Sequence, residues 1–474
     1  MGTELTKALE EIQAAFSVDK AYLSRATNHF LMAMVAGLTI QDSTRAYMPM
    51  IPSYVSSIPT GEEHGLYLAA DLGGTNFRVC SINLHGDHTF DLKHSKHTVP
   101  VDLIKANTSD ALFSFVALKI ELFLKERHDD LDDSVNLKMG VTFSFPVEQT
   151  AIDRGKLIRW TKGFDLPDCV GRDVVDLFQS HIDKLKLPVT VTALANDTVG
   201  TLLSRSYSNN IEKTNARTVI GTIFSTGTNG AYFELIQNIP KIRSSSIPKN
   251  TTGMVINTEW GSFDNSLEVL PKTPWDALVD QETPNKGYHM FEKRISAMFL
   301  GELLRVILFD LFERGLVFQD LYKARQNTLP HTLTEPFLLD AKIMSYLEID
   351  DSTDLKMSEL LLENELILPT TLEERKVIQI LTRMISHRAA YLSAIPIAAI
   401  VTRVKDRYLD DDADFEVGHD GSLIEFYPGF KKKVLEAFEL IEPLSGTNKK
   451  VHLRIAKDGS GVGAALCACM ARTI

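Results

Sequence analysis

The first residues that could do chemistry lie between two apolar runs near position 70. Asp71 ends the first run, and residues 73–78 read Gly-Gly-Thr-Asn-Phe-Arg. Glycines leave backbone N–H groups open to phosphate oxygens, while threonine, asparagine and arginine side chains add hydrogen-bond donors. Asp71 suits a hydrated magnesium ion, because Mg2+ prefers carboxylate and water oxygens. We therefore expect phosphate-binding residues at Asp71, Gly73, Gly74, Thr75, Asn76 and Arg78.

The spacing in this loop excludes two widespread phosphate-binding motifs. No Gly-Lys-Ser/Thr follows, and residues 77–82 read as a strand rather than a helix, so the loop is not a Walker loop. The Gly-x-Gly-x-x-Gly fingerprint of dinucleotide-binding folds is also missing at this point. The alternative is an ordinary Gly-Gly turn between two strands.

A second loop repeats the pattern. Strand-like residues 217–224 and 231–236 flank the sequence Ser-Thr-Gly-Thr-Asn-Gly. Thr226 and Gly227 could hold a phosphate in the same way, and the repetition predicts an internal duplication of the fold. The alternative is a plain hairpin turn.

Two further segments place small polar or cationic groups among aromatic residues. Ser144 lies in Thr-Phe-Ser-Phe-Pro, and Thr161 and Lys162 lie in Arg-Trp-Thr-Lys-Gly-Phe. This mixture suits a neutral, polyhydroxylated ligand. Taken alone, each segment could equally be a capped loop beside a core strand.

Carboxylates and amides complete the candidate set. Asn196 and Asp197 follow an apolar strand-like run, where the aspartate could accept a proton from a substrate hydroxyl while the asparagine orients it. The alternative is a helix N-cap. Glu259 and Glu292 could each accept hydrogen bonds from sugar hydroxyls, or could be surface charges.

The pattern of apolar residues predicts the elements that position these groups. We expect a helical region over residues 4–40, and strands at 66–70, 77–82, 139–145 and 189–195. A helix should follow the last of these strands over about 199–206, and a capping box at Thr370 or Thr371 should open a long helix towards residue 390. No linker rich in Gly, Ser or Pro divides the chain, so we expect two interleaved lobes. The last helix, 462–470, should then return to the lobe that the first strands form.

Composition narrows the class of protein. The chain has 474 residues, a net charge of −12 and a pI of about 5.6, which argues against nucleic acid or an anionic membrane as the main partner. Four irregularly spaced cysteines predict reduced thiols and a cytoplasmic protein. We expect no signal peptide, and the longest apolar stretch noted, residues 31–40, is too short to span a bilayer.

The order of these motifs along the chain resembles that of eukaryotic hexokinases, and most of all fungal glucokinases, over about residues 20–474. The resemblance implies the actin-like, ribonuclease-H-like α/β ATPase fold, with a small lobe (66–200 plus 458–474) and a large lobe (1–65 plus 201–457) around a cleft. It implies ATP and Mg2+, and transfer of phosphate to the 6-hydroxyl of a hexose.

The resemblance also implies roles for individual residues. Asp197 would be the general base and Lys162 would favour negative charge near the reacting oxygen. The adenosine end would lie near residues 420–422 and 458–461. The implied sugar contacts are Ser144, Thr161, Lys162, Asn196, Asp197, Asn229, Glu259 and Glu292. Beyond the first loop, the implied ATP contacts are Thr226, Gly227, Asp458, Gly459 and Ser460.

One segment departs from the family. Hexokinases often have Asn-Pro-Gly-Gln-Gln before the Glu-Lys pair, whereas residues 285–289 here read Asn-Lys-Gly-Tyr-His. Because this loop borders the sugar in the family, a kinase for N-acetylglucosamine, mannose or fructose stays open. A non-catalytic sugar sensor and a polymerising actin-like ATPase are alternatives of other classes, and the protein could be a monomer or a homodimer.

Overall fold

The computed structural model describes residues 2–40, 48–73, 76–106, 108–128, 135–160, 163–209, 215–242, 247 and 250–471. Four of the predicted site residues lie outside this part of the chain: Gly74, Thr75, Thr161 and Lys162.

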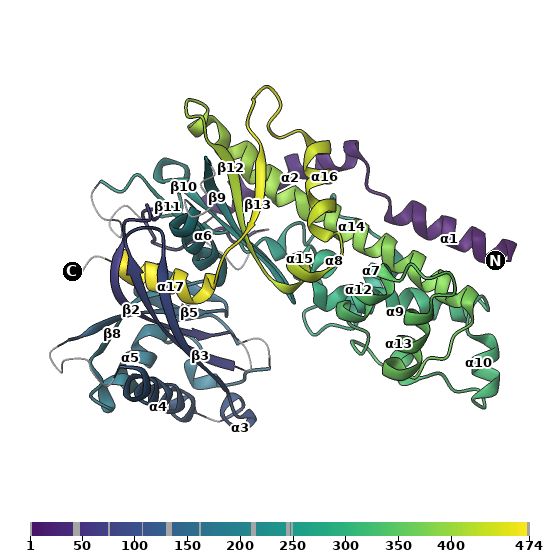
Figure 1. The fold of residues 1–474 in the computed structure, drawn as a ribbon, viewed down its shortest axis with the longest axis horizontal. Coiled ribbons are helices and arrows are strands. Elements are labelled where there is room, and N and C mark those ends of the chain that lie inside the picture. The colour runs from purple at the N-terminus through teal and green to yellow at the C-terminus, as the bar shows by residue number, and fades with distance from the viewer. Residues whose placement is uncertain are drawn as a thin grey trace.

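The first sheet has five strands in the order β4-β3-β2-β5-β8, and it lies at the lower left in Figure 1. Its strands are β2 (His64–Leu72), β3 (Asn76–His85), β4 (Phe90–Thr98), β5 (Leu137–Phe143) and β8 (Val189–Ala195). The β2, β3 and β4 strands pair antiparallel, whereas β5 and β8 continue the sheet in parallel with β2. The predicted hairpin around the first loop is therefore confirmed.

The second sheet repeats this arrangement. Its strands are β1 (Ile51–Pro52), β9 (Ala216–Phe224), β10 (Thr228–Leu235), β11 (Gly253–Asn257), β12 (Asp414–Asp420) and β13 (Val451–Ile455). Strands β9, β10 and β11 pair antiparallel, and β12 and β13 continue in parallel with β9. Each of the two loops thus joins equivalent antiparallel strands, β2 to β3 and β9 to β10, which supports the predicted duplication.

Two helices in equivalent positions pack between the two sheets. Helix α6 (Asp197–Ser208) follows β8, and α17 (Gly459–Met470) follows β13. They cross at Gly200 and Gly463, where the lack of side chains lets the backbones touch. Helix α17 also lies directly against β5, because a Cβ on Gly140 would stand 1.9 Å from the Ala464 carbonyl oxygen. Figure 1 shows α17, in yellow, beside β2 and β5, which carry the purple and blue colours of earlier parts of the chain.

Helices cover the outer faces of both sheets and extend to the right in Figure 1. The predicted helical region 4–40 is two helices, because Asp19 breaks it and caps the second one through Tyr22 N. A short hairpin of β6 (Val147–Ala151) and β7 (Arg154–Leu157) forms a separate two-stranded sheet. The helices not yet given are α1 (Thr3–Phe16), α2 (Lys20–Thr39), α3 (Val101–Ile104), α4 (Asp110–Arg127), α5 (Val174–Lys184), α7 (Pro274–Gln281), α8 (Glu292–Ile295), α9 (Ala297–Glu313), α10 (Gln319–Ala324), α11 (His331–Thr334), α12 (Ala341–Ile349), α13 (Lys356–Leu366), α14 (Leu372–Val404), α15 (Ser422–Phe426) and α16 (Phe430–Ile441).

Helix α14 is the central helix of this region. Thr371 and Glu374 form the predicted capping box, but the helix continues to Val404, past the expected end near 390 and through Pro396. Its length and composition would allow the segment Leu372–Tyr408 to cross a membrane, yet 83% of its apolar window is buried inside the protein, as in a core helix. The expectation that residues 31–40 form the longest apolar stretch is wrong, because α14 contains a longer one.

Candidate active site

The start of α6 places the predicted base. Strand β8 ends at Ala195, and Asn196 is the N-cap of α6. The Asn196 side-chain oxygen accepts hydrogen bonds from Thr198 N at 2.9 Å and from Thr198 Oγ1 at 2.6 Å. The capping alternative would have made Asp197 the cap, whereas the cap is Asn196, and it fixes Asp197 in the first turn of α6 at the carboxyl end of the strand.

A chain of amides and carboxylates leads away from Asn196. Asn229 Nδ2 lies 3.4 Å from Asn196 Oδ1 and donates to Asn257 Oδ1 at 2.7 Å. Asn257 Nδ2 in turn donates to Glu259 Oε1 at 2.7 Å. Glu259 has a left-handed backbone with φ of 52°, an uncommon conformation for a side chain of this kind. Three predicted sugar residues, Asn196, Asn229 and Glu259, are thus brought into one network.

Glu292 joins this region through the second loop. Its Oε2 accepts a hydrogen bond from Thr228 N at 3.0 Å, and a Cβ on Gly227 would lie 2.8 Å from the same oxygen. Gly227, predicted to contact phosphate, therefore also borders the predicted sugar carboxylate. His289, from the segment that departs from the family pattern, has its Nδ1 at 3.9 Å from Glu292 Oε1. Burial, aided by Arg159 and Lys293, lowers the pKa of His289 to about 4.

The first loop is held by the start of α17. Ser460 Oγ donates a hydrogen bond to Asp71 Oδ2 at 3.0 Å, and Arg78 forms an ion pair with Asp458. Two of the predicted ATP residues from the far end of the chain therefore contact the first loop directly. Gly73 is next to Asp71 and to the predicted sugar residue Ser144, because a Cβ on Gly73 would lie 3.2 Å from Ser144 Oγ.

The second loop meets the end of β12. Ser225 Oγ lies 3.2 Å from Ser422 Oγ, and a Cβ on Gly421 would stand 2.4 Å from the Phe224 carbonyl oxygen. Gly421 has φ of 119°, which only glycine adopts without strain. Thr226 in the same loop is exposed to solvent. Gly421 and Ser422, which belong to one of the two segments predicted near adenosine, thus lie beside the second loop.

Asp420, the last residue of β12, lies next to the first residue of α17. A Cβ on Gly459, the first residue of α17, would lie 3.4 Å from Asp420 Oδ2. Burial, together with the negative charges of Glu425, Asp197 and Asp458, raises the pKa of Asp420 to about 6. Three carboxylates therefore lie close together: Asp420 at the end of β12, Asp197 at the start of α6 and Asp458 at the start of α17. The guanidinium of Arg78 neutralises only one of these charges, that of Asp458.

Several residues that organise this site were not predicted from the sequence. Asn257 bridges Asn229 and Glu259, and its position two residues before Glu259 could have marked it. Thr228 contributes its backbone N–H to Glu292 and its hydroxyl to Trp260 Nε1, which donates at 2.9 Å. Asp420 was expected only as part of the segment 420–422, and its closeness to Asp197 and Asp458 comes from parts of the chain distant in the sequence.

Comparison with known proteins places the chain in a family. Two family models, both described as hexokinase, match residues 8–207 and 219–470. Glucokinase-1 of Saccharomyces cerevisiae is 46% identical over 489 residues, which cover 98% of this chain and 97% of that protein. The glucokinase of Aspergillus niger is 43% identical, with 99% of this chain and 98% of that protein covered.

A solved structure gives the same result for the fold. The hexokinase from Schistosoma mansoni complexed with glucose is 31% identical and superposes with a TM-score of 0.83, covering 98% of this chain and 99% of that chain. The predicted actin-like α/β ATPase fold and the resemblance read from the motifs are both confirmed. The chain belongs to the hexokinase family.

Proposed function

We propose that this protein transfers the γ-phosphoryl group of ATP to the 6-hydroxyl of glucose. The observation that carries the proposal is the position of Asp197 at the head of α6, beside the network of Asn196, Asn229, Asn257 and Glu259. In this role Asp197 would be a proton acceptor at one end of a row of groups suited to sugar hydroxyls. The printed names of the similar proteins, glucokinases and a glucose-bound hexokinase, support glucose as the sugar.

The chemistry follows from the properties of phosphoryl transfer. The transition state is loose, so that positioning and charge stabilisation supply most of the catalysis. Asp197 would accept the proton of the 6-hydroxyl, late in the transfer, because an ordinary aspartate is a weak base at neutral pH. The sugar would be held by the network, by Glu292 and by Ser144. We also assign sugar binding to Thr161 and Lys162, which lie outside the described residues.

The nucleotide would be held by the two loops together. Arg78, fixed by Asp458, would supply a cationic fork to the phosphates, and Gly73 and Gly227 would let backbone N–H groups approach. We assign the same role to Asn76, Thr226, Gly459 and Ser460, and to Gly74 and Thr75 outside the described residues. Contacts of α17 with the first loop and of Ser422 with the second support a single nucleotide between them.

The residues around Asp71 fit a hydrated magnesium ion. Asp71 provides a carboxylate near the end of β2. Gly73 leaves space beside it, because a Cβ at position 73 would stand 3.4 Å from Asp71 Oδ1. Within the described ranges, no group of three or more His, Cys, Asp or Glu side chains is arranged to hold a metal directly. Asp71 would therefore bind Mg2+ through water, and the ion would neutralise charge on the phosphates.

Closure of the lobes would exclude water, the competing phosphate acceptor. We propose residues 66–200 with 458–474 as the small lobe and 1–65 with 201–457 as the large lobe. We place the enzyme in the cytoplasm, which is supported by four cysteines without disulfides: Cys80, Cys169, Cys467 and Cys469. A monomer and a homodimer are both compatible with this proposal.

A second candidate is a kinase for another hexose. It is supported by His289, which stands beside Glu292 where the sequence departs from the family pattern. One experiment separates the candidates: ADP release measured with glucose, mannose, fructose and N-acetylglucosamine. We expect the highest kcat/KM with glucose. A higher kcat/KM for another hexose would identify that sugar as the substrate in place of glucose. No ADP release with any of the four sugars would favour the non-catalytic sugar sensor.

A further inference from the structure

The connection between α7 and α8, residues 284–290, is here called the α7–α8 loop. Its residues 284–288 are all exposed to solvent, and its end brings His289 beside Glu292, with 3.9 Å between His289 Nδ1 and Glu292 Oε1. An exposed segment of this kind buries little apolar surface, so that packing does not determine its path. The path of the loop must therefore be set by polar contacts.

Lys293 makes the first of these contacts. It directly follows Glu292 in α8, yet its side chain is only 2% exposed. Its Nζ pairs with Asp280 Oδ1 of α7 at 2.6 Å and donates to the Asn285 carbonyl oxygen at 2.8 Å. The backbone N–H of Lys293 donates to the His289 carbonyl oxygen at 3.0 Å. One residue thus binds the preceding helix, the start of the loop and the residue that faces Glu292.

Asp280 and Arg294 hold the rest of the loop. Both carboxylate oxygens of Asp280 accept the Gly287 N–H, at 3.0 and 3.1 Å. Arg294, which is buried like Lys293, donates from Nη1 to the Met290 carbonyl oxygen at 2.7 Å. Hydrogen bonds to charged groups are stronger than those between neutral groups. The start, middle and end of an exposed loop are therefore each fixed by a charged side chain.

The backbone of His289 shows the effect of these contacts. Its φ of 54° is left-handed, a conformation that residues other than glycine adopt only where their surroundings impose it. Gly261 lies against both His289 and Glu292, because a Cβ at position 261 would stand 3.1 Å from His289 Nδ1 and 3.3 Å from Glu292 Cβ. The two polar side chains are thus held next to each other at a fixed separation.

We propose that Lys293 and Asp280 are positioning residues for the sugar. Their ion pair fixes the α7–α8 loop, so that His289 and Glu292 present their polar atoms to the sugar hydroxyls in one arrangement before the sugar arrives. This inference rests on the proposed function, because it takes Glu292 as a sugar contact. A site arranged in advance lowers the cost of binding. The pair therefore acts on sugar affinity, whereas the phosphoryl transfer depends on Asp197.

Two variants of the full chain test the proposal: Lys293→Met, which removes the cation, and the milder Asp280→Asn, whose amide oxygen can still accept the Gly287 N–H. Isothermal titration calorimetry with glucose gives the Kd, and steady-state kinetics give kcat and both KM values. Because a small misplacement of binding groups costs much affinity, the Kd and KM for glucose should rise at least about tenfold in Lys293→Met and about threefold in Asp280→Asn. The kcat and the KM for ATP should stay within about twofold.

This pattern separates positioning from a merely structural role. A variant that only lost stability would have a smaller folded fraction, which lowers the apparent kcat and leaves the Kd and KM for glucose unchanged. The double variant Asp280→Asn/Lys293→Met should bind glucose about as weakly as Lys293→Met alone, because both residues act through the same loop.

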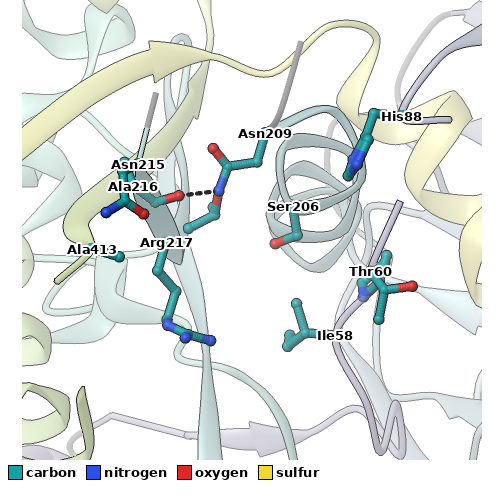
Figure 2. A pocket seen from close by; sticks show the side chains of 11 residues that line it. Ile58, Thr60, His88, Ser206, Asn209, Asn215, Ala216, Arg217 and Ala413 are labelled. Carbon is teal, nitrogen blue, oxygen red and sulfur yellow. Dashed lines mark hydrogen bonds between the residues drawn. The ribbon is translucent and has the colours of Figure 1, made fainter. Parts of the chain in front are cut away.

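Lys449→Met is the matched control. The Lys449 side chain is 9% exposed, and its Nζ pairs with Asp411 at 3.0 Å and donates to the Ala413 carbonyl oxygen at 2.6 Å. This pair lies beside the start of β12, whereas Asp420 of the candidate site ends that strand. Figure 2 shows the region, with Arg217 and Ala413 beside a cavity of about 270 Å3. We expect the Kd for glucose to be unchanged in this variant.

An unchanged Kd for glucose in Asp280→Asn and Lys293→Met would overturn the proposal, and so would equal weakening in Lys449→Met. If Lys293→Met does not fold, Asp280→Asn decides the question alone. Calorimetry needs no turnover, so the two proposals can fail separately. Wild-type protein that binds glucose but releases no ADP would contradict the proposed function and leave the loop test valid, whereas wild-type protein that binds no glucose would overturn both.

Discussion

Gly463 of α17 lies directly against Gly200 of α6, so closely that a Cβ on Gly463 would stand 2.0 Å from the Gly200 Cα. The two helices begin at opposite parts of the candidate site. Helix α6 carries Asp197 at its start, and α17 carries Ser460, which donates to Asp71. This crossing therefore sets the distance between the proposed base and the first phosphate loop.

We predict that Gly463→Ala lowers the free energy of unfolding by about 1–3 kcal/mol, the usual cost of overpacking. The atoms that the new methyl group would meet are backbone atoms of Gly200, which cannot turn away as a side chain could. Urea denaturation measures the change. Gly2→Ala is the control, because its Cβ would meet nothing within 4 Å. Equal stability of both variants would show that the crossing is not tight.

Asp197→Asn should lower kcat roughly 10²- to 10⁴-fold, the usual contribution of a general base. Sugar binding should persist, because the amide keeps the shape of the carboxylate and the network from Asn196 to Glu259 is intact. Steady-state kinetics with tryptophan fluorescence for sugar binding measure both quantities. Asp173→Asn is the control, since Asp173 caps α5 and lies outside the candidate site. Near-normal turnover in Asp197→Asn would show that Asp197 is not the general base.

Arg78→Ala should raise the KM for ATP roughly 10- to 100-fold, as expected for a lost charged hydrogen bond of about 1.5–3 kcal/mol. The KM for sugar should change less. Arg78 also holds Asp458 at the start of α17, so some loss of stability should accompany the kinetic effect. Arg172→Ala, which removes an exposed arginine near Asp168, is the kinetic control. A larger effect on sugar than on ATP would mean that the first loop contacts the other substrate.

Local patterns were sufficient for the strands and loops of the site. The expected strand at 189–195 and the observed β8 coincide, because an apolar run ends at an asparagine that caps the next helix. Both Gly-Thr loops join paired strands as expected, because glycine and asparagine favour turns between strand-like runs. The break at Asp19 was missed although Asp19 is a good capping residue, since helical spacing of apolar residues continues on both sides.

Long-range partners could not be read from the sequence. The pair of Arg78 and Asp458 joins residues 380 positions apart, and no local rule links them. The left-handed backbone of Glu259 is held by its surroundings against the preference of the residue itself. The end of α14 could not be predicted from its apolar residues. Proline normally ends a helix, but Pro396 lies inside α14, where burial of the surrounding side chains offsets the free energy that proline costs.

His289 should stay neutral from pH 8 to pH 5.5, because burial lowers its pKa to about 4. We therefore predict that the KM for glucose shows no inflection near pH 6.5, the ordinary pKa of histidine. The measurement is the KM for glucose across this range, in the wild type and in His289→Gln. An inflection near 6.5 that disappears in His289→Gln would show that the imidazole is more open to water than the structure indicates.

Asp420→Asn should stabilise the protein at neutral pH. Burial raises the folded-state pKa of Asp420 to about 6 from an ordinary value of 3.8, so the folded protein holds this proton more tightly than the unfolded chain. The stability that results is complete below about pH 4 and is lost as the pH rises through 6. Above that range the ionised carboxylate costs up to about 3 kcal/mol for a shift of about two pKa units, and asparagine avoids this cost.

Thermal unfolding of wild type and Asp420→Asn at pH 5 and pH 7.5 tests the sign. The gain in Tm should be larger at pH 7.5. Asp414→Asn at the other end of β12 is the matched control with the opposite sign: burial opposes its ionisation, but the hydrogen bond from His452 holds the pKa of Asp414 below its ordinary value. That variant should lose stability at pH 7.5. A gain in Asp420→Asn that is equal at both pH values would mean that Asp420 is not the group whose proton is held.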